Sequence, residues 1–516
     1  MSVNQPREPG PKPAAGAADP GGTEPAGRRA AEGGARAHDP RTPEALIELM
    51  SRDWEPASTF PAQPHPATPY HARRREALSA AFPKAHLVIP TGLARMRSND
   101  SEYRFRPGSD FYWLAGHTEP GCVLVLRADP VAGAGGHQAT LYVEPRADRS
   151  TPAFFTNALT GELWVGPRRG VEESAFLLGI DCAPLARLDE DLAGLRGEVL
   201  ALRGLDPRVD GLLPEPGDPS LEPKLGEVLS ELRLVKDGYE IGALDRAVAA
   251  TIQGFEDVVR AIPEAMEQGE RVVEGVFNLR ARVEGNDVGY GTIAASGAHA
   301  TTLHWNHNDG EVRSGELLLL DAGVECADLY TADVTRTLPV SGRFTPVQRR
   351  LYELVFRAQE AAIAEVRPGA AFLAPHRAAM RVLAEGLEAL GVLPVSAEEA
   401  LAEDRQLHRR YTLHGTSHML GLDVHDCSHA RDQEYRSGRL QPGHVLTVEP
   451  GLYFQRDDLT VPEPLRGIGI RIEDDVVVTA DGCRVLSSAL PRHPDDVEGW
   501  MAELRGQEVQ LRRPLH

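Results

Sequence analysis

Apolar residues recur at helical spacing over three long segments in the second half of the chain. From Tyr239 to Ile262 they fall at steps of three and four residues, at Ile241, Leu244, Val248, Ile252 and Phe255. Residues 351–366 and 374–390 carry the same period of 3.6 residues. A stripe of this kind is typical of a helix that packs one face on a core. The pattern therefore predicts three amphipathic helices, with hairpin-like strands between them.

The first half of the chain alternates helical segments with short strands. Residues 73–81 have helical patterning, and three short apolar runs bounded by turn residues predict strands at 86–90, 122–127 and 139–144. Residues 99–114 hold much of the aromatic content and fit no simple helix, whereas residues 221–236 fit a linker helix. Strands that alternate with helices in this way predict a compact α/β domain.

Two short stretches repeat one pattern of apolar and acidic residues. Residues 315–323 (Gly-Glu-Leu-Leu-Leu-Leu-Asp-Ala-Gly) and 443–451 (Gly-His-Val-Leu-Thr-Val-Glu-Pro-Gly) each run from a glycine through a strand-like segment to an acid, Asp321 or Glu449. Each is typical of a buried strand that ends by presenting one carboxylate. A buried carboxylate is costly unless it is paired or bound to a cation. The repeat therefore indicates a duplicated fold with a metal site where its halves meet.

A further acid follows each of these strands. Asp333 comes 12 residues after Asp321, and a hairpin over that distance would bring the two carboxylates to one face. Glu473 follows the second strand, at the end of a run in which isoleucine alternates with other residues. This period of two puts Arg471 and Glu473 on one face of a strand. An arginine beside metal-binding acids can hydrogen-bond them and hold their geometry.

A glycine-rich segment supplies three histidines, His414, His418 and His425, and it fits a loop better than a long helix. One histidine among four carboxylates makes an oxygen-rich, hard site, which favours Mn²⁺, with Mg²⁺ and Co²⁺ as alternatives, over a thiolate-rich zinc site. Four carboxylates balance two divalent ions, and such a pair lowers the pKa of a water held between them. Taken alone, each of these acids or histidines could instead cap a turn or satisfy a polar group. The metal hypothesis depends on the whole set.

Composition and charge exclude several classes of partner. The formal net charge of −21 argues against nucleic acid, whose phosphates need a basic surface. We find no apolar run of about 18 residues, so no membrane span is expected, and no secretory signal. The five cysteines are scattered without C-x-x-C spacing, as expected for reduced thiols in a cytoplasmic protein. The first 40 residues are rich in Pro, Gly and Ala and predict a disordered tail, which we extend to residue 68.

The ordered motifs of the chain resemble a known peptidase family. They are the Asp321-Ala-Gly motif, Thr-Ala-Asp333-Val-Thr-Arg-Thr, the histidine segment 414–425, Val-Glu449-Pro-Gly and Gly-Ile-Gly-Ile-Arg-Ile-Glu473-Asp. Together they resemble the metallopeptidases with the pita-bread fold, which include methionine aminopeptidase, prolidase, creatinase and aminopeptidase P. Residues 100–120 and 161–168 are similar to the amino-terminal domain of bacterial aminopeptidase P, a domain that methionine aminopeptidase lacks. The closest likeness is therefore to the aminopeptidase P family.

The resemblance implies a site for two metal ions. Asp321 and Asp333 would bind one ion. Asp333 and Glu473 would bridge to a second ion, which His418 and Glu449 would complete. All five side chains are present in this sequence, so an inactive relative is not expected.

The resemblance also implies roles for residues that surround the ions. His304 would lie near the substrate amine and the scissile bond. His414 and His425 would line the pocket, with His425 at the scissile carbonyl or its oxyanion. Glu449 would move the proton from the water toward the leaving nitrogen, and Arg471 would support the ligands.

The implied architecture is α+β, with a smaller amino-terminal α/β domain over residues 69–235, a pita-bread (duplicated αβ) catalytic domain over 236–492 and a tail over 493–516. The implied activity is metal-dependent release of the N-terminal residue from peptides with proline in second position. Two alternatives remain: a prolidase, which would cleave only Xaa-Pro dipeptides, and a non-catalytic pita-bread module that binds peptides. Relatives are often dimers or tetramers, so a homo-oligomer is expected.

Overall fold

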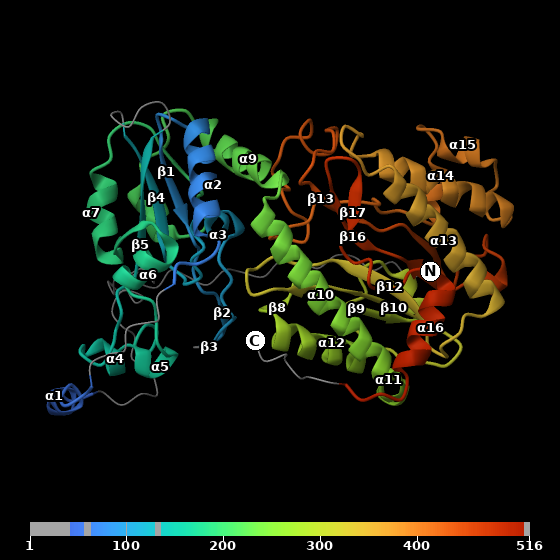
Figure 1. Ribbon diagram of the computed structural model, residues 1–516, viewed down its shortest axis with the longest axis horizontal. Coiled ribbons are helices and arrows are strands. Elements are labelled where there is room, and N and C mark those ends of the chain that lie inside the picture. The colour runs from blue at the N-terminus through green and yellow to red at the C-terminus, as the bar shows by residue number, and fades with distance from the viewer. Residues whose placement is uncertain (1–41, 56–62, 100, 130–135, 510–516) are drawn as a thin grey trace, which may run out of the picture.

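The structure, a computed structural model, describes residues 42–55, 63–99, 101–129 and 136–509. Within these residues the chain forms two domains, and helix α9 (Leu221–Leu234) joins them (Figure 1). Most of the predicted disordered tail lies outside the described residues. The prediction is wrong for helix α1 (Glu44–Met50), which lies inside that segment. Helix α1 follows Pro43 and has an acid in its first turn, which the helix dipole favours, although it buries no residue.

The amino-terminal domain is built on a mixed sheet. Its strands are β1 (His86–Pro90), β4 (Val123–Ala128), β5 (His137–Val143), β6 (Asp181–Pro184) and β7 (Val199–Ala201), with a separate pair β2 (Met96–Ser98) and β3 (Ser101–Glu102). The five-stranded sheet has the order β6-β5-β4-β1-β7, with β1 antiparallel to β4 and parallel to β7. The three strands predicted here correspond to β1, β4 and β5.

Short helices surround this sheet. They are α2 (Thr68–Ala81), α3 (Ser109–Ala115), α4 (Ala153–Thr156), α5 (Glu162–Val165), α6 (Val171–Leu178), α7 (Leu188–Ala193) and α8 (Pro207–Leu212). The aromatic segment 99–114 contains β3 and most of α3, which explains why it fits no single pattern. Phe111, Tyr112 and Trp113 of α3 are buried in a core that continues into the carboxy-terminal domain.

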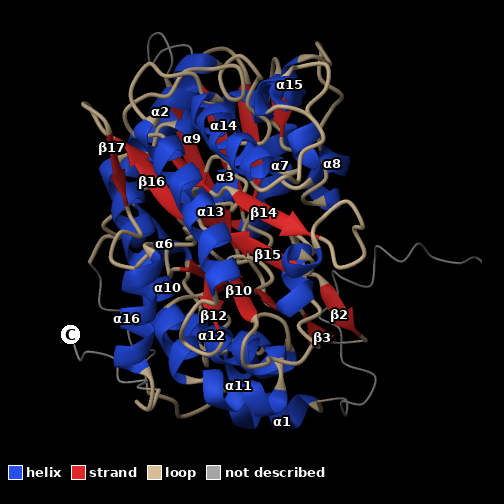
Figure 2. Ribbon diagram, turned by 90° about the vertical axis from the view of Figure 1, so that its right-hand side faces the viewer, coloured by secondary structure: helices blue, strands red, loops and turns tan. Residues whose placement is uncertain are grey.

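The carboxy-terminal domain contains one arrangement twice, in which helices cover antiparallel strands. The first half has α10 (Gly238–Arg260), α11 (Ile262–Gln268) and α12 (Glu270–Glu284), with β8 (Asp287–Val288), β9 (Ile293–Ser296), β10 (Leu317–Ala322), β11 (Val324–Glu325) and β12 (Val334–Pro339). The second half has α13 (Pro346–Ala364), α14 (Ala374–Ala389) and α15 (Ala397–Leu401), with β13 (Val445–Val448), β14 (Gly451–Phe454), β15 (Ile468–Arg471), β16 (Asp474–Val478) and β17 (Cys483–Val485). In Figure 2, α13 crosses in front of β14 and β15, which it contacts. The α+β class and the duplicated pita-bread arrangement are confirmed.

The predicted helices and the predicted repeat occur as expected. The three amphipathic segments form α10, α13 and α14, and the linker segment forms α9. After the second half, helix α16 (Pro494–Leu504) buries Val497, Met501 and Leu504. Part of the segment predicted as a tail, residues 493–516, therefore packs on the catalytic domain through this helix. Among the described residues, no helix combines the length and the apolar character that crossing a membrane requires.

Two antiparallel pairs bring the acids to the centre of the domain. Strand β10 pairs with β12, and Asp321 lies opposite Thr335 in this register. Strand β13 pairs with β16 in the same way. Asp333 and Glu473 are the residues immediately before β12 and β16, and a β-bridge between Thr335 and Glu473 joins the two halves. The strand predicted to run to Glu473 ends at Arg471, and Glu473 instead makes this bridge.

Candidate metal centre

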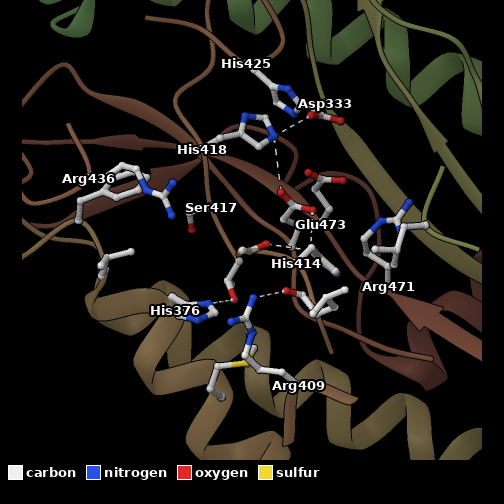
Figure 3. A pocket seen from close by; sticks show the side chains of 18 of the residues that line it. Asp333, His376, Arg409, His414, Ser417, His418, His425, Arg436, Arg471 and Glu473 are labelled. Atoms are coloured by element: carbon white, nitrogen blue, oxygen red, sulfur yellow. Dashed lines mark hydrogen bonds and ion pairs between the residues drawn. The ribbon is translucent and has the colours of Figure 1, made fainter. Parts of the chain in front are cut away.

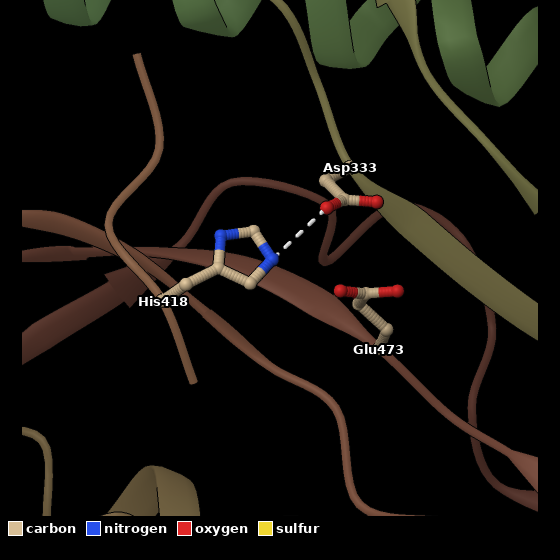
Figure 4. Close-up of side chains that lie close together, drawn as sticks. All are labelled: Asp333, His418 and Glu473. Carbon is tan, nitrogen blue, oxygen red and sulfur yellow. Dashed lines mark ion pairs between the residues drawn. The ribbon is translucent and has the colours of Figure 1, made fainter. Parts of the chain in front are cut away.

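Three side chains converge where the two halves meet. One ligand atom from each of Asp333, His418 and Glu473 lies within 4.8 Å of the other two, an arrangement that can hold a metal ion (Figure 4). His418 Nε2 lies 3.3 Å from Asp333 Oδ2. Asp333 is 5% exposed and Glu473 is 1% exposed, so their carboxylates are almost fully removed from water.

The other two predicted ligands flank this group. Glu449 Oε1 lies 3.5 Å from His418 Nε2, on the side of the second half. Asp321, on β10, accepts a hydrogen bond from Arg471 Nη2 at 2.5 Å. The structure therefore brings all five predicted ligands to one centre, and it places Arg471 against one of them, as expected for a residue that supports the ligands.

The electrostatics of these acids fit a cation. Burial raises the pKa of Glu473 well above its usual range, and repulsion from Asp333 adds to the effect. Burial likewise raises the pKa of Asp321, and it raises the pKa of Glu449 to about 7. Buried acids that repel one another are stable as anions only beside compensating positive charge. The donor set of carboxylate oxygens and one imidazole nitrogen suits hard divalent ions.

Several residues that the sequence analysis missed hold the ligands in place. The Tyr290 hydroxyl lies 2.7 Å from Asp321 Oδ1 and 2.5 Å from Asp333 Oδ1, and its single proton can be donated to one of them at a time. The Thr335 hydroxyl donates to Glu473 Oε2 at 2.6 Å. Asp475 Oδ2 accepts the Asp333 backbone N–H at 3.0 Å. Hydrogen bonds of this kind orient metal ligands.

The signals for these missed residues differ in strength. Asp475 follows Glu473 and Asp474, and three consecutive acids directly before an apolar run could have marked it. Tyr290 lies between two glycines in irregular backbone after β8, where no periodic pattern distinguishes it from a surface tyrosine.

His414 is fixed by its neighbours in one neutral form. Its Nδ1 lies 2.8 Å from the Gly415 carbonyl and donates to it, so Nε2 accepts from the Tyr453 hydroxyl, also at 2.8 Å. Tyr453 in turn accepts from Arg471 Nη1 at 2.9 Å. Burial, with Arg471 adding, lowers the pKa of His414 to about 3. His414 is therefore tied to the arginine that holds Asp321.

His425 and His304 face the space in front of the ligands. The ring of His425 lies edge-on to that of His418, with centroids 4.4 Å apart, and both His425 and His304 are exposed. All three predicted pocket histidines line a cavity of about 1520 Å³ that also contains the five ligands (Figure 3). The part each histidine plays in a reaction stays a prediction.

Comparison with known proteins gives consistent results over most of the chain. The sequence model described as "Metallopeptidase family M24" matches residues 242–480, and that described as "Aminopeptidase P, N-terminal domain" matches residues 71–199. The chain is 50% identical to Xaa-Pro aminopeptidase 1 of Streptomyces coelicolor over 467 residues, which are 90% of this chain and 94% of that protein. It is 34% identical to Xaa-Pro aminopeptidase of Escherichia coli over 454 residues, 84% of this chain and 98% of that protein.

Solved structures agree with these relatives. Proline aminopeptidase P II from Yersinia pestis superposes with a TM-score of 0.74 at 33% identity, over 84% of this chain and 99% of that chain. Aminopeptidase P from Escherichia coli with the inhibitor Pro-Leu has a TM-score of 0.74 at 32% identity, over 85% of this chain and 99% of that chain. The chain therefore belongs to metallopeptidase family M24, and within it to the aminopeptidase P family.

Proposed function

We propose that the chain is a dinuclear metal-dependent Xaa-Pro aminopeptidase, which releases the N-terminal residue from peptides with proline in second position. The observation that carries this proposal is that four carboxylates and one imidazole, the five predicted ligands, lie together at the junction of the duplicated halves. Identity of 50% to a named Xaa-Pro aminopeptidase over 94% of that protein supports it.

We further propose how the ligands divide between two ions. Asp321 and Asp333 bind one ion, and Glu449 and His418 bind the other. Asp333 and Glu473 would be shared, since both offer a ligand atom to the same group as His418 at the junction of the two halves. The oxygen-rich donor set favours Mn²⁺. When bound, the ions supply a water of lowered pKa and polarise the carbonyl before proline.

The chain's own residues complete the reaction in this proposal. Glu449 takes the proton of the attacking water and returns it to the proline nitrogen, since its carboxylate lies beside the other proposed ligands and lines the cavity. His425, exposed to the cavity, donates to the developing oxyanion. His304 lies near the substrate amine. The proline nitrogen carries no N–H in the peptide, so selectivity comes from a pocket shaped for the pyrrolidine ring.

The setting of the enzyme is also a proposal. Five free cysteines agree with a reducing, cytoplasmic compartment. A homo-oligomer, either a dimer or a tetramer, remains expected. The domain limits at residues 69, 235 and 492 stay predictions; the matched family models run from residue 71 to 199 and from 242 to 480.

The test is a cleavage assay on Xaa-Pro-Yaa tripeptides with and without Mn²⁺. Glu449→Ala and His418→Ala should abolish cleavage while circular dichroism shows an intact fold. Near-normal turnover by either variant with Mn²⁺ would show that the site assignment is wrong. Cleavage of Xaa-Pro dipeptides alone would identify a prolidase, and no bound metal by elemental analysis after purification with Mn²⁺ would favour the non-catalytic module.

A further inference from the structure

The cavity extends beyond the metal centre to a group of arginine side chains. Arg377 and Arg381 come from α14, Arg409 precedes the histidine segment, and Arg436 follows it. All four are exposed and line the same cavity as the metal ligands. In Figure 3, Arg436 and Arg409 lie on one side of the pocket with His376, while Asp333 and Arg471 lie on the other. We call these four residues the arginine wall.

The arginine wall carries positive charge that no acid of the described residues neutralises through an ion pair. Arg409 donates to Gln406 Oε1 at 2.9 Å and to the Leu413 carbonyl at 3.1 Å, both of which are uncharged acceptors. The side chains of Arg377, Arg381 and Arg436 make no hydrogen bond or ion pair within the part of the chain that the structure describes. Elsewhere in the described residues, exposed arginines such as Arg410 and Arg431 do form ion pairs. The chain as a whole has a net charge of −21, so acids are plentiful.

Two acids share the rim of the cavity with the arginine wall. Asp432 accepts a short hydrogen bond from the Ser437 hydroxyl, and Glu403 lies on the same lining. Neither forms an ion pair with the wall. Four guanidinium groups against two carboxylates leave this end of the cavity positive.

His376 lines the same cavity and lies close to the arginine wall. Its Nδ1 lies 3.0 Å from the Thr416 hydroxyl. Burial, with the nearby His408, Arg409, Arg377 and Arg436 adding to the effect, lowers the pKa of His376 to about 4. Three arginines of the wall therefore lie close enough to His376 to act on one shared point, which is the property needed to bind one anionic group together.

The direction of the substrate follows from charge. The free amine of the substrate is a cation and is repelled by the wall, so the wall faces the part of the peptide that follows proline. An extended chain advances about 3.3 Å per residue, and a cavity of about 1520 Å³ exceeds the ~300–1,000 Å³ of most ligand sites. The cavity therefore has room for residues beyond the proline.

We propose that the arginine wall binds carboxylates on the leaving side of the substrate, so that the enzyme favours peptides with a negative charge within about three residues after proline. The charge is supplied by an acidic side chain or by the C-terminal carboxylate, because both present the same group to a guanidinium. This inference depends on the proposed Xaa-Pro cleavage, and it names the class of peptide that the same site prefers.

The test compares kcat/KM for four peptides and three proteins. The peptides are Ala-Pro-Gly-Glu-Gly and Ala-Pro-Gly-Gln-Gly, each with a free and with an amidated C-terminus. The proteins are the wild type, the double variant Arg377→Gln with Arg381→Gln, and the control Arg357→Gln. Arg357 is an exposed arginine on α13 that does not line the cavity. None of these arginines is among the metal ligands or the proposed catalytic residues.

We expect the wild type to prefer glutamate over glutamine, or the free C-terminus over the amide, by about 5- to 10-fold, mainly through KM. The double variant should lose most of this preference and cleave the neutral amidated peptide as the wild type does, whereas Arg357→Gln should keep it. Added salt should weaken the preference, because exposed charges are screened.

The two comparisons separate the sources of the charge. A glutamate effect assigns the wall to acidic side chains, and a free C-terminus effect alone assigns it to the terminal carboxylate. Equal kcat/KM for all four peptides, or a preference that survives in the double variant, would overturn the inference while leaving Xaa-Pro cleavage intact. Failure to cleave any of the four peptides would overturn both proposals.

Discussion

The buried arginine Arg233 couples the linker helix to the loop that carries His425. At the end of α9 it donates to Asp110 of the amino-terminal domain at 2.7 Å and to Asp423 at 2.8 Å. It also makes a short hydrogen bond to Asp426, which is fully buried. Asp423 and Asp426 flank His425. Replacing Arg233 with methionine keeps most of the apolar length of the side chain and removes the cation that ties these acids together.

The expected cost follows from the partners that remain. Removing one member of a buried ion pair costs about 3–5 kcal/mol, because the other charge is left uncompensated. Lys236 Nζ still donates to Asp426 Oδ2 at 2.8 Å, so we expect the lower end, about 3 kcal/mol. The side chain of Asp423 is 43% exposed and adds little. In a domain of roughly 250 residues, ~2 °C per kcal/mol is typical, which predicts a thermal midpoint lower by ~6 °C.

The assay is thermal unfolding together with kcat on an Xaa-Pro tripeptide. The control is Arg484→Met, since Arg484 pairs with Asp245 at 2.8 Å with side chains 48% and 42% exposed. A pair of that kind contributes about 0–1 kcal/mol. We expect Arg233→Met to lower both the midpoint and kcat. If its midpoint falls no more than that of Arg484→Met and kcat is unchanged, the idea that buried charge holds this loop is refuted.

Further predictions concern the ligand supports, a tight glycine and the metal itself. Tyr290→Phe removes a hydroxyl that contacts two of the acids, and titration should show divalent-metal affinity lower by roughly 10- to 100-fold, with unchanged affinity speaking against a role in orienting ligands. Gly323→Ala would place a Cβ 1.7 Å from a backbone carbonyl oxygen and should lower the thermal midpoint. Gly275→Ala, at a helical site with open space, should leave the free energy of unfolding unchanged or raise it by about 0.5–1 kcal/mol. Without metal, burial raises the pKa of Glu449 to about 7, while His418, despite its burial, has its pKa raised to about 9 by Asp333 and Glu449. Groups with raised pKa values stabilise the metal-free fold at low pH, and they lose that contribution as pH rises through 7 and 9. Removing the metal with a chelator should therefore lower the thermal midpoint more at high pH than at low pH. Equal shifts at both pH values would contradict these assignments.

The acid-bearing strands at the centre of the carboxy-terminal domain could be predicted from the sequence, because the patterns that indicate them lie within short segments. A run of apolar residues that ends in Asp321 or Glu449 predicts a buried strand with an acid at its end, and β10 and β13 have this form. The spacing from Asp321 to Asp333 predicted a hairpin, and β10 and β12 pair in that way. A buried acid has few roles other than pairing with a cation, so the five candidate ligands could be named before their distances were known.

Other features depend on contacts that no periodic pattern contains. Tyr290 reaches Asp321 and Asp333 from irregular backbone, and its position depends on how the chain crosses the domain after α12. Helix α1 forms within a segment whose composition resembles a disordered tail. The arginine wall combines residues from α14 and from two loops, which are adjacent only after folding. Long-range packing determines the positions of Tyr290 and of the arginine wall, and neither composition nor spacing reveals it. Helix α1 buries no residue, so packing does not explain that helix.

The charges of the cavity combine into one field once metal is considered. In the proposed holoenzyme, two divalent ions would balance the four carboxylates Asp321, Asp333, Glu449 and Glu473, so that Arg471, which donates to Asp321, leaves one net positive charge at this centre. The metal centre then contributes little net charge, and the arginine wall becomes the strongest source of potential in the cavity. A peptide has a positive and a negative end, so this field turns the carboxylate end toward the wall and the amine away from it. The wall would therefore orient the substrate before any contact with the proline ring, and it would do so most strongly for short peptides, whose two charged ends both lie inside the cavity.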